Sequence, residues 1–486
     1  MTTQYRLLIG GEWVDGAHGS YGIVNPATEE SFAQAPEASV DQALAAARAA
    51  RDAFPGWWRT PASERARLLE AVAQRLRERA GDLVPLIISE TGATAMVGSR
   101  MQVPVAIERF ERYARGAMKD LNTPLSPSAM SATPLAPGGL IGAVVNRQPV
   151  GAVACISPYN FPLVNMAGKV APALAVGCTV VMRSAPQDPL AVIELAAIMD
   201  DVGFPAGVVN VVTSSGPAPA VALTTTKDID MVSFTGSTAV GQSIFEAGGK
   251  TMKRLLLELG GKGAALVLDD ADLDVAVGTI ASVWAFHTGQ ICTAPTRAIV
   301  HLRRYDELVE RLAERARVLK VGDPTSIDTI VGPVISSAQR EQIERYIGLG
   351  EDEGAELVVD GRRPAHLDRG FYVGPTLLAG AKQGMTPVQE EIFGPVVVVV
   401  AFDDDDEGIA IANGTDFGLY DYVFSTDSER AYRVAKQLRS GNVGINTAQR
   451  NHDAPFGGFK MSGVGRDGGD YGMLAYTETQ TIVWPG

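Results

Sequence analysis

One cysteine of the sequence lies among small and polar residues, where a thiol can react. Cys292 belongs to the segment WAFHTGQICTAPTR, residues 284–297. The other two cysteines, Cys155 and Cys178, lie in apolar runs, where a thiol usually packs as a small hydrophobe. A nucleophile instead needs access and a lowered pKa. Cys292 is therefore the candidate nucleophile, although its type alone also fits a packed thiol.

A carboxylate at a position suited to chemistry precedes a pair of glycines. Glu258 ends the apolar run Leu255–Leu257 and is followed closely by Gly260 and Gly261, which let backbone or a ligand approach. A carboxylate near a reactive thiol can serve as a general base. The residues alone fit a solvated charge at a helix end equally well.

Six motifs, in order along nearly the whole chain, resemble the aldehyde dehydrogenase superfamily. They are SPYNFP with Asn160, FTGSTAVG at 234–241, LELGGK with Glu258, GQIC with Cys292, EEIFGPV at 390–396 and PFGGFKMSGVGRD at 455–467. Any one of them is weak evidence, but six in the family's order identify the chain as a member. The resemblance implies oxidation of an aldehyde to a carboxylic acid with NAD or NADP.

The resemblance gives four residues a part in catalysis. Cys292 attacks the aldehyde carbon to form a thiohemiacetal, which becomes a thioester after hydride transfer to the nicotinamide. The amide of Asn160 and the backbone N–H of Cys292 stabilise the oxyanion. Glu258 activates the water that hydrolyses the thioester, and Lys169 supports the network. Without the resemblance, Asn160 fits a structural turn residue and Lys169 a surface residue.

The expected cofactor is NADP or NAD, bound at the carboxyl edge of a parallel sheet. The residues expected to contact it are Ile156, Ser157, Pro158, Tyr159, Arg183, Gly236, Ser237, Leu259, Glu391 and Phe393. The turn at Gly236 is not a GxGxxG fingerprint, and a plain strand-to-helix turn fits it as well. The resemblance places the pyrophosphate there, at a helix start. It also selects Glu391 over the adjacent Glu390 as the partner of the nicotinamide ribose.

One departure from the family bears on the choice of cofactor. Where the family commonly has Lys-Pro-Ser-Glu, this chain has Arg183-Ser184-Ala185-Pro186. In the resemblance, the missing Glu binds the adenosine ribose hydroxyls and repels a 2′-phosphate. Pro186 does neither, and Arg183 offers a planar fork suited to a phosphate. The sequence therefore predicts that NADP is accepted.

Residues beside the nucleophile and several aromatic residues are candidates for the substrate pocket. They are Trp284, Ile291, Thr293, Tyr420, Tyr422 and Phe456. Such side chains are typical of small-molecule sites, although each is more often a core residue. No basic cluster lies beside these motifs in the sequence. We therefore expect an apolar aldehyde, aromatic or medium aliphatic, rather than a semialdehyde that carries a carboxylate.

The elements that position these residues alternate between helix and strand. Helices are expected at 40–54, 63–80, 164–175, 190–202 and 217–224, and strands at 151–157, 178–183, 208–213 and 231–235. This β-α-β alternation predicts a parallel, doubly wound sheet. A second apolar block from 264 to 444 predicts a second α/β domain, and its valines 396–400 fit a strand buried on both faces.

We therefore expect an α/β protein with two doubly wound open-sheet domains and a small β element for oligomerisation. The expected bounds are 1–127 with 150–261 for a Rossmann-like cofactor domain, 262–462 for a catalytic domain, and 128–149 with 473–486 for the β element. In the resemblance, homodimers or homotetramers exchange a hairpin and a C-terminal strand, and segments 140–150 and 477–484 have the pattern of edge strands. Segment 124–139 resembles the linker into the hairpin, and the acidic segment 403–407 is expected to be a solvated turn.

Composition excludes several classes of protein. The chain has 486 residues, 46% of them hydrophobic, which is enough for two cores. A net charge of −14 argues against a nucleic-acid or anionic membrane partner, since both are bound through clusters of Lys and Arg. The N-terminal residues lack a signal-peptide pattern, so we expect a cytoplasmic protein. Neither cysteine nor histidine spacing indicates a metal site or a disulfide framework.

Three alternative functions remain open from the sequence. A CoA-acylating dehydrogenase would transfer the thioester to CoA, and Glu258 speaks against it. A cysteine esterase would pair Cys292 with His287 or His452 and need no nicotinamide. A non-catalytic homologue would keep only the fold, and the intact catalytic residues oppose that reading.

Overall fold

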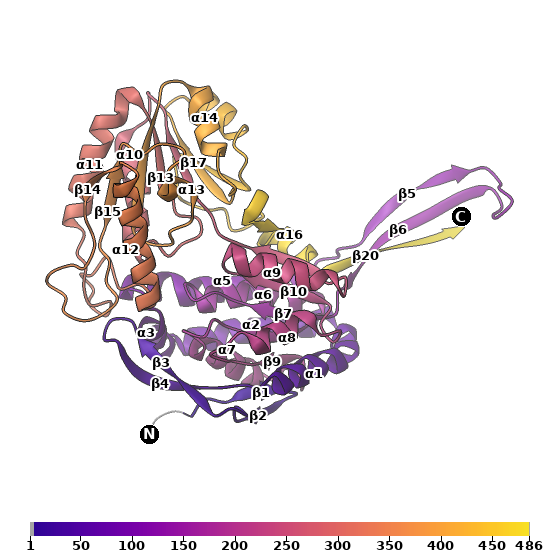
Figure 1. Cartoon of the computed structure of the whole chain (residues 1–486). Helices are drawn as coiled ribbons and strands as arrows, with labels where there is room; N and C mark the ends of the chain where they lie inside the picture. Colours follow the sequence, from indigo (N-terminus) through magenta and orange to yellow (C-terminus); the bar gives the residue numbers. More distant parts are fainter. Residues whose placement is uncertain (1–3, 486) are drawn as a thin grey trace.

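The computed structural model describes residues 4–485, which form sheets of eight, seven, three and two strands together with their helices (Figure 1). Residues 1–3 of the expected cofactor domain and Gly486 of the expected β element lie outside the described residues. None of the helices in residues 4–485 is long and apolar enough to cross a membrane.

The first half of the chain supplies most of a largely parallel sheet. In spatial order its strands are β19 (Gly463–Val464), β11 (Arg254–Glu258), β10 (Met231–Thr235), β7 (Ala152–Ile156), β8 (Thr179–Arg183), β9 (Val209–Val211), β1 (Leu7–Ile9) and β2 (Glu12–Val14). Strands β7 to β11 run parallel. They alternate with α6 (Pro162–Val176), α7 (Leu190–Asp201), α8 (Ala218–Thr225) and α9 (Thr238–Gly249). The expected doubly wound arrangement of the first domain is confirmed.

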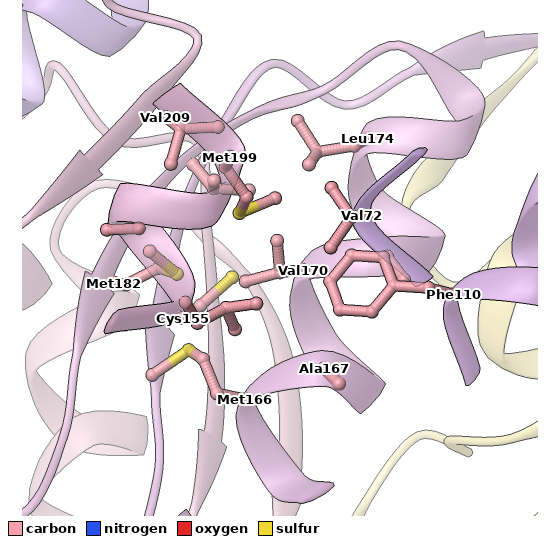
Figure 2. Packing of buried hydrophobic residues seen from close by; sticks show 14 of the residues in the cluster. Val72, Phe110, Cys155, Met166, Ala167, Val170, Leu174, Met182, Met199 and Val209 are labelled. Atoms are coloured by element: carbon pink, nitrogen blue, oxygen red, sulfur yellow. The ribbon is translucent and has the colours of Figure 1, made fainter. Parts of the chain in front are cut away.

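Helices cover both faces of this sheet. On one face, α6 and α7 pack with α2 (Ala62–Glu78) and α5 (Val103–Ala117), and on the other α8 and α9 pack with α1 (Val40–Arg59). Figure 2 shows Cys155 among the buried side chains of the first face, beside Met166 and Met182. Cys155 and Cys178 are both fully buried, as expected for structural thiols.

The second half of the chain builds the sheet of the second domain. Its strands, in spatial order, are β14 (Glu356–Val359), β15 (Thr376–Ala379), β16 (Val396–Phe402), β13 (Arg297–His301), β12 (Ala264–Val267), β17 (Tyr420–Phe424) and β18 (Asn442–Ile445). Val397 and Val399 pack with α10 (Leu273–Ala285) and α11 (Tyr305–Val318). Val396, Val398 and Val400 pack on the opposite side with α12 (Ser337–Asp352). The valine strand is therefore buried on both faces, as predicted.

A three-stranded antiparallel sheet projects away from both domains (Figure 1). It consists of β20 (Thr477–Pro485), β6 (Gly139–Pro149) and β5 (Thr123–Met130). Leu140 and Trp484 are among its exposed apolar residues. Strands β3 (Ser20–Asn25) and β4 (Glu30–Pro36) form a separate two-stranded antiparallel sheet.

Two local expectations are wrong in part. Segment 124–139 is not only a linker, because β5 occupies its first half, where an edge strand tolerates Pro124. The acidic segment 403–407 is not only a solvated turn. Asp404 accepts a hydrogen bond from Glu407 N at 2.9 Å and caps α14 (Asp405–Asn413), whose acidic first turn suits a helix N-terminus.

Substitution of a central core residue tests this packing. Leu266 in β12 is fully buried, whereas Leu302 is 55% exposed. We expect Leu266→Ala to lower the free energy of unfolding by about 2–5 kcal/mol, because it removes buried methyl groups and leaves a cavity. Leu302→Ala should have little effect. Urea unfolding of the two variants, followed by intrinsic fluorescence, makes the comparison, and equal midpoints would contradict it.

Candidate active site

The loop that carries Cys292 follows α10 and is held by a buried glutamine. Gln290 is fully buried, its Oε1 accepts a hydrogen bond from Ile335 N at 3.0 Å, and its Nε2 donates to His287 O at 3.2 Å. His287 and Thr288 adopt left-handed backbone conformations, φ 50° and 55°. Such strain persists only where surrounding contacts impose it, and it is common at functional sites.

The two domains meet at Gly260 and Gly261. A Cβ at Gly261 would lie 2.5 Å from the carbonyl oxygen of Cys292, and a Cβ at Gly260 would overlap the carboxylate of Glu391. Glu391 Oε1 accepts a hydrogen bond from Gly261 N at 3.0 Å. The glycine pair therefore permits the Cys292 loop and Glu391 to contact the backbone directly after β11, which ends in Glu258.

Glu258 is a buried carboxyl at the end of a strand, not a solvated charge at a helix end. It is 3% exposed, and neither carboxylate oxygen has a hydrogen-bond partner within residues 4–485. Burial raises its pKa well above the usual value, and the negative charge of Asp467 acts in the same direction. Lys169 and Arg450 oppose that shift. A carboxyl of this kind can exchange protons nearer neutral pH than an exposed glutamate.

Lys169 is fully buried in α6 rather than at the surface. Its Nζ donates a hydrogen bond to Ser233 Oγ at 3.4 Å, and Ser233 Oγ is 2.8 Å from the hydroxyl oxygen of Tyr476. Burial lowers the pKa of Lys169, whereas Asp467 and Glu258 raise it. Asp467 ends the last motif, but sequence reasoning gave it no role. The structure adds it to this charged group.

The thiol of Cys292 is half-buried, and its environment disfavours the thiolate. Its pKa is raised to about 12, first by burial and then by Glu258 and Glu391, whereas Arg450 and the backbone N–H of Cys292 lower it. The chain alone therefore keeps this thiol protonated at neutral pH. A positive charge brought in by a ligand would favour the nucleophilic form.

Asn160 joins the first domain to the Cys292 loop. It lies in the turn between β7 and α6, is 4% exposed, and donates from Nδ2 to Gln290 O at 2.8 Å. One of the two Nδ2 hydrogens remains for a ligand. The amide is thereby held next to the loop that carries the thiol.

No hydrogen bond joins Cys292 to a histidine within residues 4–485. The ring of His287 packs 5.2 Å from that of Phe161, and burial lowers its pKa to about 4. His452 is exposed on a loop. The cysteine–histidine pair that an esterase would need is absent from the described residues.

Several expected cofactor residues lie along one edge of the first sheet. Ile156 ends β7 and Arg183 ends β8, and Ser157 N donates to Arg183 O at 3.0 Å. Ser157 Oγ is buried without a partner in the described chain. Ser237 caps α9 by accepting a hydrogen bond from Val240 N at 3.4 Å. The exposed start of α9 and the free serine hydroxyl suit a phosphate-bearing ligand.

Further cofactor candidates border this edge. Gly236 N donates to Glu258 O at 3.1 Å, and Leu259 packs against Gly241 in the first turn of α9. Arg183 is 7% exposed and donates from Nη2 to Gly216 O at 3.3 Å. Pro158 is half-buried in the turn after β7.

Glu391 and Phe393 approach the same place from the second domain. Burial raises the pKa of Glu391 to about 7. The ring of Phe393 lies edge-on to that of Tyr159, with 5.8 Å between centroids. Glu390 points elsewhere, because its carboxylate accepts a hydrogen bond from the Tyr346 hydroxyl at 2.6 Å. The geometry thus distinguishes two adjacent glutamates that sequence patterns alone could not separate.

Most of the expected substrate residues surround the Cys292 loop. Tyr422 donates its hydroxyl to Thr293 O at 2.9 Å and stacks on Tyr420, with ring centroids 4.8 Å apart. Ile291 and Phe456 are half-buried against the same apolar cluster. Trp284 differs, because it is fully buried and donates to Thr376 O at 3.3 Å. Trp284 is therefore a core residue, and we leave it out of the proposed substrate wall.

A basic residue that sequence reasoning did not consider also lies at this wall. The guanidinium carbon of Arg450 is 3.8 Å from the centroid of the Phe456 ring. Its charge acts on Cys292, Glu258 and Tyr420. The sequence shows no basic cluster beside the motifs, but folding brings this one arginine to the wall from the loop that precedes the last motif.

Sequence and structure both match known aldehyde dehydrogenases. A sequence model described as the aldehyde dehydrogenase family matches residues 13–482. The chain is 39% identical over 485 residues to a 3-succinoylsemialdehyde-pyridine dehydrogenase of a Pseudomonas species, covering 99% of this chain and 98% of that protein.

Two solved structures have the same fold. Betaine aldehyde dehydrogenase from Staphylococcus aureus, solved with NAD+, is 35% identical with a TM-score of 0.94, covering 99% of this chain and 94% of that one. A cysteine-to-alanine mutant of aldehyde dehydrogenase C from Pseudomonas syringae, solved with NAD+ and octanal, is 38% identical with a TM-score of 0.92, covering 98% and 96%. This chain therefore belongs to the aldehyde dehydrogenase family.

Proposed function

We propose that the protein oxidises an aldehyde to a carboxylic acid, with NAD or NADP as the oxidant and a covalent intermediate on Cys292. The observation that carries this proposal is the contact at Gly260 and Gly261, which brings the Cys292 loop beside the strand that ends in Glu258. A half-buried thiol and a buried carboxyl without a partner thus share one site.

In the first step, the Cys292 thiol releases its proton to solvent, its sulfur adds to the aldehyde carbon, and the electron pair of the C=O π bond moves to the carbonyl oxygen, which becomes negatively charged. The free hydrogen of Asn160 Nδ2 and the backbone N–H of Cys292 stabilise this oxyanion. When bound, NAD or NADP supplies the hydride acceptor and a positive charge that favours the thiolate. Ser157, Ser237 and Glu391 would hold it. Loss of hydride from the carbon leaves a thioester on Cys292.

In the second step, Glu258 takes a proton from water as the water attacks the thioester, the C–S bond breaks, and the carboxylic acid leaves as the Cys292 thiolate is restored. Its raised pKa suits this exchange of protons, because an exposed glutamate would be a weak base near neutral pH. Lys169 and Asp467 act on the pKa of Glu258 with opposite signs. We assign both to the positioning of this base.

We also propose that NADP is accepted alongside NAD. The side chain of Pro186 offers no acceptor for ribose hydroxyls and no charge against a 2′-phosphate. Of the three guanidinium nitrogens of Arg183, only Nη2 has a hydrogen-bond partner in residues 4–485, so Nη1 remains for a phosphate.

The wall around Cys292 supports a substrate whose aldehyde is attached to an apolar or aromatic body. Tyr420, Tyr422, Phe456, Ile291 and Thr293 supply aromatic and aliphatic surface beside the thiol. Aromatic side chains of this kind bind flat or extended apolar groups.

We further propose that the protein is a homodimer or homotetramer assembled through the projecting sheet. Ile482, Val483 and Trp484 of β20 are 46%, 57% and 45% exposed, and Leu140 of the neighbouring strand β6 is 57% exposed. A projecting sheet with this much exposed apolar surface is a liability for an isolated chain.

Two variants test the chemistry. We expect Cys292→Ala to abolish aldehyde-dependent formation of NAD(P)H, because no thiohemiacetal can form. Glu258→Gln should slow steady turnover by about 10²–10⁴-fold, the usual contribution of a general base. It should still give a burst of one NAD(P)H per site, because only thioester hydrolysis is blocked. Stopped-flow absorbance with benzaldehyde and hexanal separates the two phases.

The matched control for these variants is Glu390→Gln. The Glu390 carboxylate accepts a hydrogen bond from the Tyr346 hydroxyl and has no part in the proposed chemistry. It should keep most of the wild-type rate. Full activity of Cys292→Ala would refute the covalent route. Release of the thioester by added CoA but not by water would indicate the acylating reaction instead.

The cofactor proposal is tested by kcat/KM with each dinucleotide. We expect the value for NADP to lie within about 100-fold of that for NAD, a difference below about 2.7 kcal/mol. Pro186→Glu should shift the ratio toward NAD, because it places an acid beside the ribose. A wild-type preference for NAD above this limit would contradict the proposal.

Mass photometry at nanomolar to micromolar concentration tests the assembly. The wild type should be a dimer or tetramer, and Ile482→Glu combined with Trp484→Lys should dissociate it, because charges replace apolar contact. Val318→Lys, at a residue that is 71% exposed on α11, is the control and should leave the mass unchanged. A monodisperse wild-type monomer would overturn the assignment.

A further inference from the structure

Arg450 lies over an aromatic ring that is fixed next to the chemistry. Phe456 N donates to Asp467 O at 2.7 Å, and Asp467 N donates to Phe456 O at 2.6 Å. This reciprocal pair holds the ring beneath the Arg450 guanidinium, 3.8 Å from its centroid. A stacked guanidinium keeps its in-plane N–H groups free for a planar acceptor.

The guanidinium of Arg450 has no carboxylate and no hydrogen-bond partner within the described chain, residues 4–485. Arg109 on α5 has no carboxylate partner within these residues either. Its side chain donates one hydrogen bond, from Nη1 to Val164 O at 2.8 Å. Arg112, three residues further along that helix, does pair with Asp453. Carboxylates are therefore available in this region, yet two guanidinium groups are left without one.

The two unpaired cations act on one another electrostatically. The charge of Arg109 lowers the pKa of Arg450, whereas the Cys292 thiol, Tyr420 and Glu258 raise it. Arg450 is exposed to solvent, yet surrounding protein is the main cause of its lowered pKa. Two like charges placed together are unfavourable until an anion lies between them.

We propose that Arg450, assisted by Arg109, binds a carboxylate on the substrate, so that the preferred substrate is an aldehyde with a carboxylate at its far end. This inference rests on the proposed function and narrows it. The aromatic wall contacts the body of the molecule, the thiol receives the aldehyde, and the guanidinium pairs with the carboxylate in a bidentate manner. Carboxylated aromatic aldehydes and ω-oxo fatty acids have this chemistry.

Matched pairs of substrates test the proposal. The probes are 4-carboxybenzaldehyde against its neutral analogue 4-formylbenzamide, and 6-oxohexanoate against hexanal. In the wild type, kcat/KM for each carboxylate should exceed that for its neutral partner by about tenfold or more, as expected for a charge-assisted hydrogen-bonded pair. Equal values, or a preference for the neutral probes, would overturn the inference.

Variants then assign the preference to the arginine. Arg450→Gln should bring the ratio of kcat/KM between each carboxylate and its neutral partner to about one, because the loss of charge beside Cys292 and Glu258 affects both members of a pair alike. Arg450→Lys should restore part of the preference for the carboxylates by charge without the planar fork. The control is Arg439→Gln, which removes an exposed arginine 5.4 Å from the centroid of the Phe459 ring. It should keep the wild-type preference.

The outcomes separate this inference from the proposed function. Oxidation of both members of each pair at equal, Cys292-dependent rates would leave the function intact and refute the role of Arg450. If no aldehyde is oxidised, calorimetry of Cys292→Ala with 4-carboxybenzaldehyde still decides the binding claim. Binding weakened by about tenfold on adding Arg450→Gln would support it, and unchanged binding would refute it.

Discussion

The direct contact between two backbones at Gly260 and Gly261 is the constraint on which the site depends. Side chains there would collide with Cys292 and Glu391, so only glycine allows the second domain to lie against the end of β11. The hydrogen bond from Gly261 N to Glu391 and that from Asn160 to Gln290 O span the same junction. Thiol, amide and carboxyl thus take their relative positions from packing between domains, which fixes geometry more firmly than a mobile loop could.

Two ionisable side chains, Lys169 and Glu258, are buried at this junction, and their burial carries a desolvation cost. Glu258 has no hydrogen-bond partner in the described chain. An apolar pair of similar volume would pack there more favourably. Functional sites commonly keep buried polar groups that do not favour folding. Hydrogen bonds through Ser233 to Tyr476 offset part of the desolvation cost of Lys169.

Sequence reasoning located the parts of the site that lie within motifs at strand ends. The strand 231–235 and the two-faced valine strand follow from apolar runs, and Glu258 and Cys292 follow from their neighbours. Arg450 and the charge of Asp467 could not be assigned in this way, because their roles arise only when the C-terminal loop folds against α5 and α6. Trp284 is close to Cys292 in the chain but fully buried and hydrogen-bonded to Thr376 O, so proximity in the sequence did not identify an accessible wall residue.

The two backbone hydrogen bonds between Phe456 and Asp467 fix the end of the loop that follows β18. Residues 447–453 are mostly exposed and lie outside the strands of the sheet, whereas Asp467 belongs to the charged group around Glu258. Substitutions in this loop are therefore expected to leave the positions of Glu258 and Cys292 unchanged. Our proposals thus assign the choice of substrate and the chemical step to separate segments of the chain.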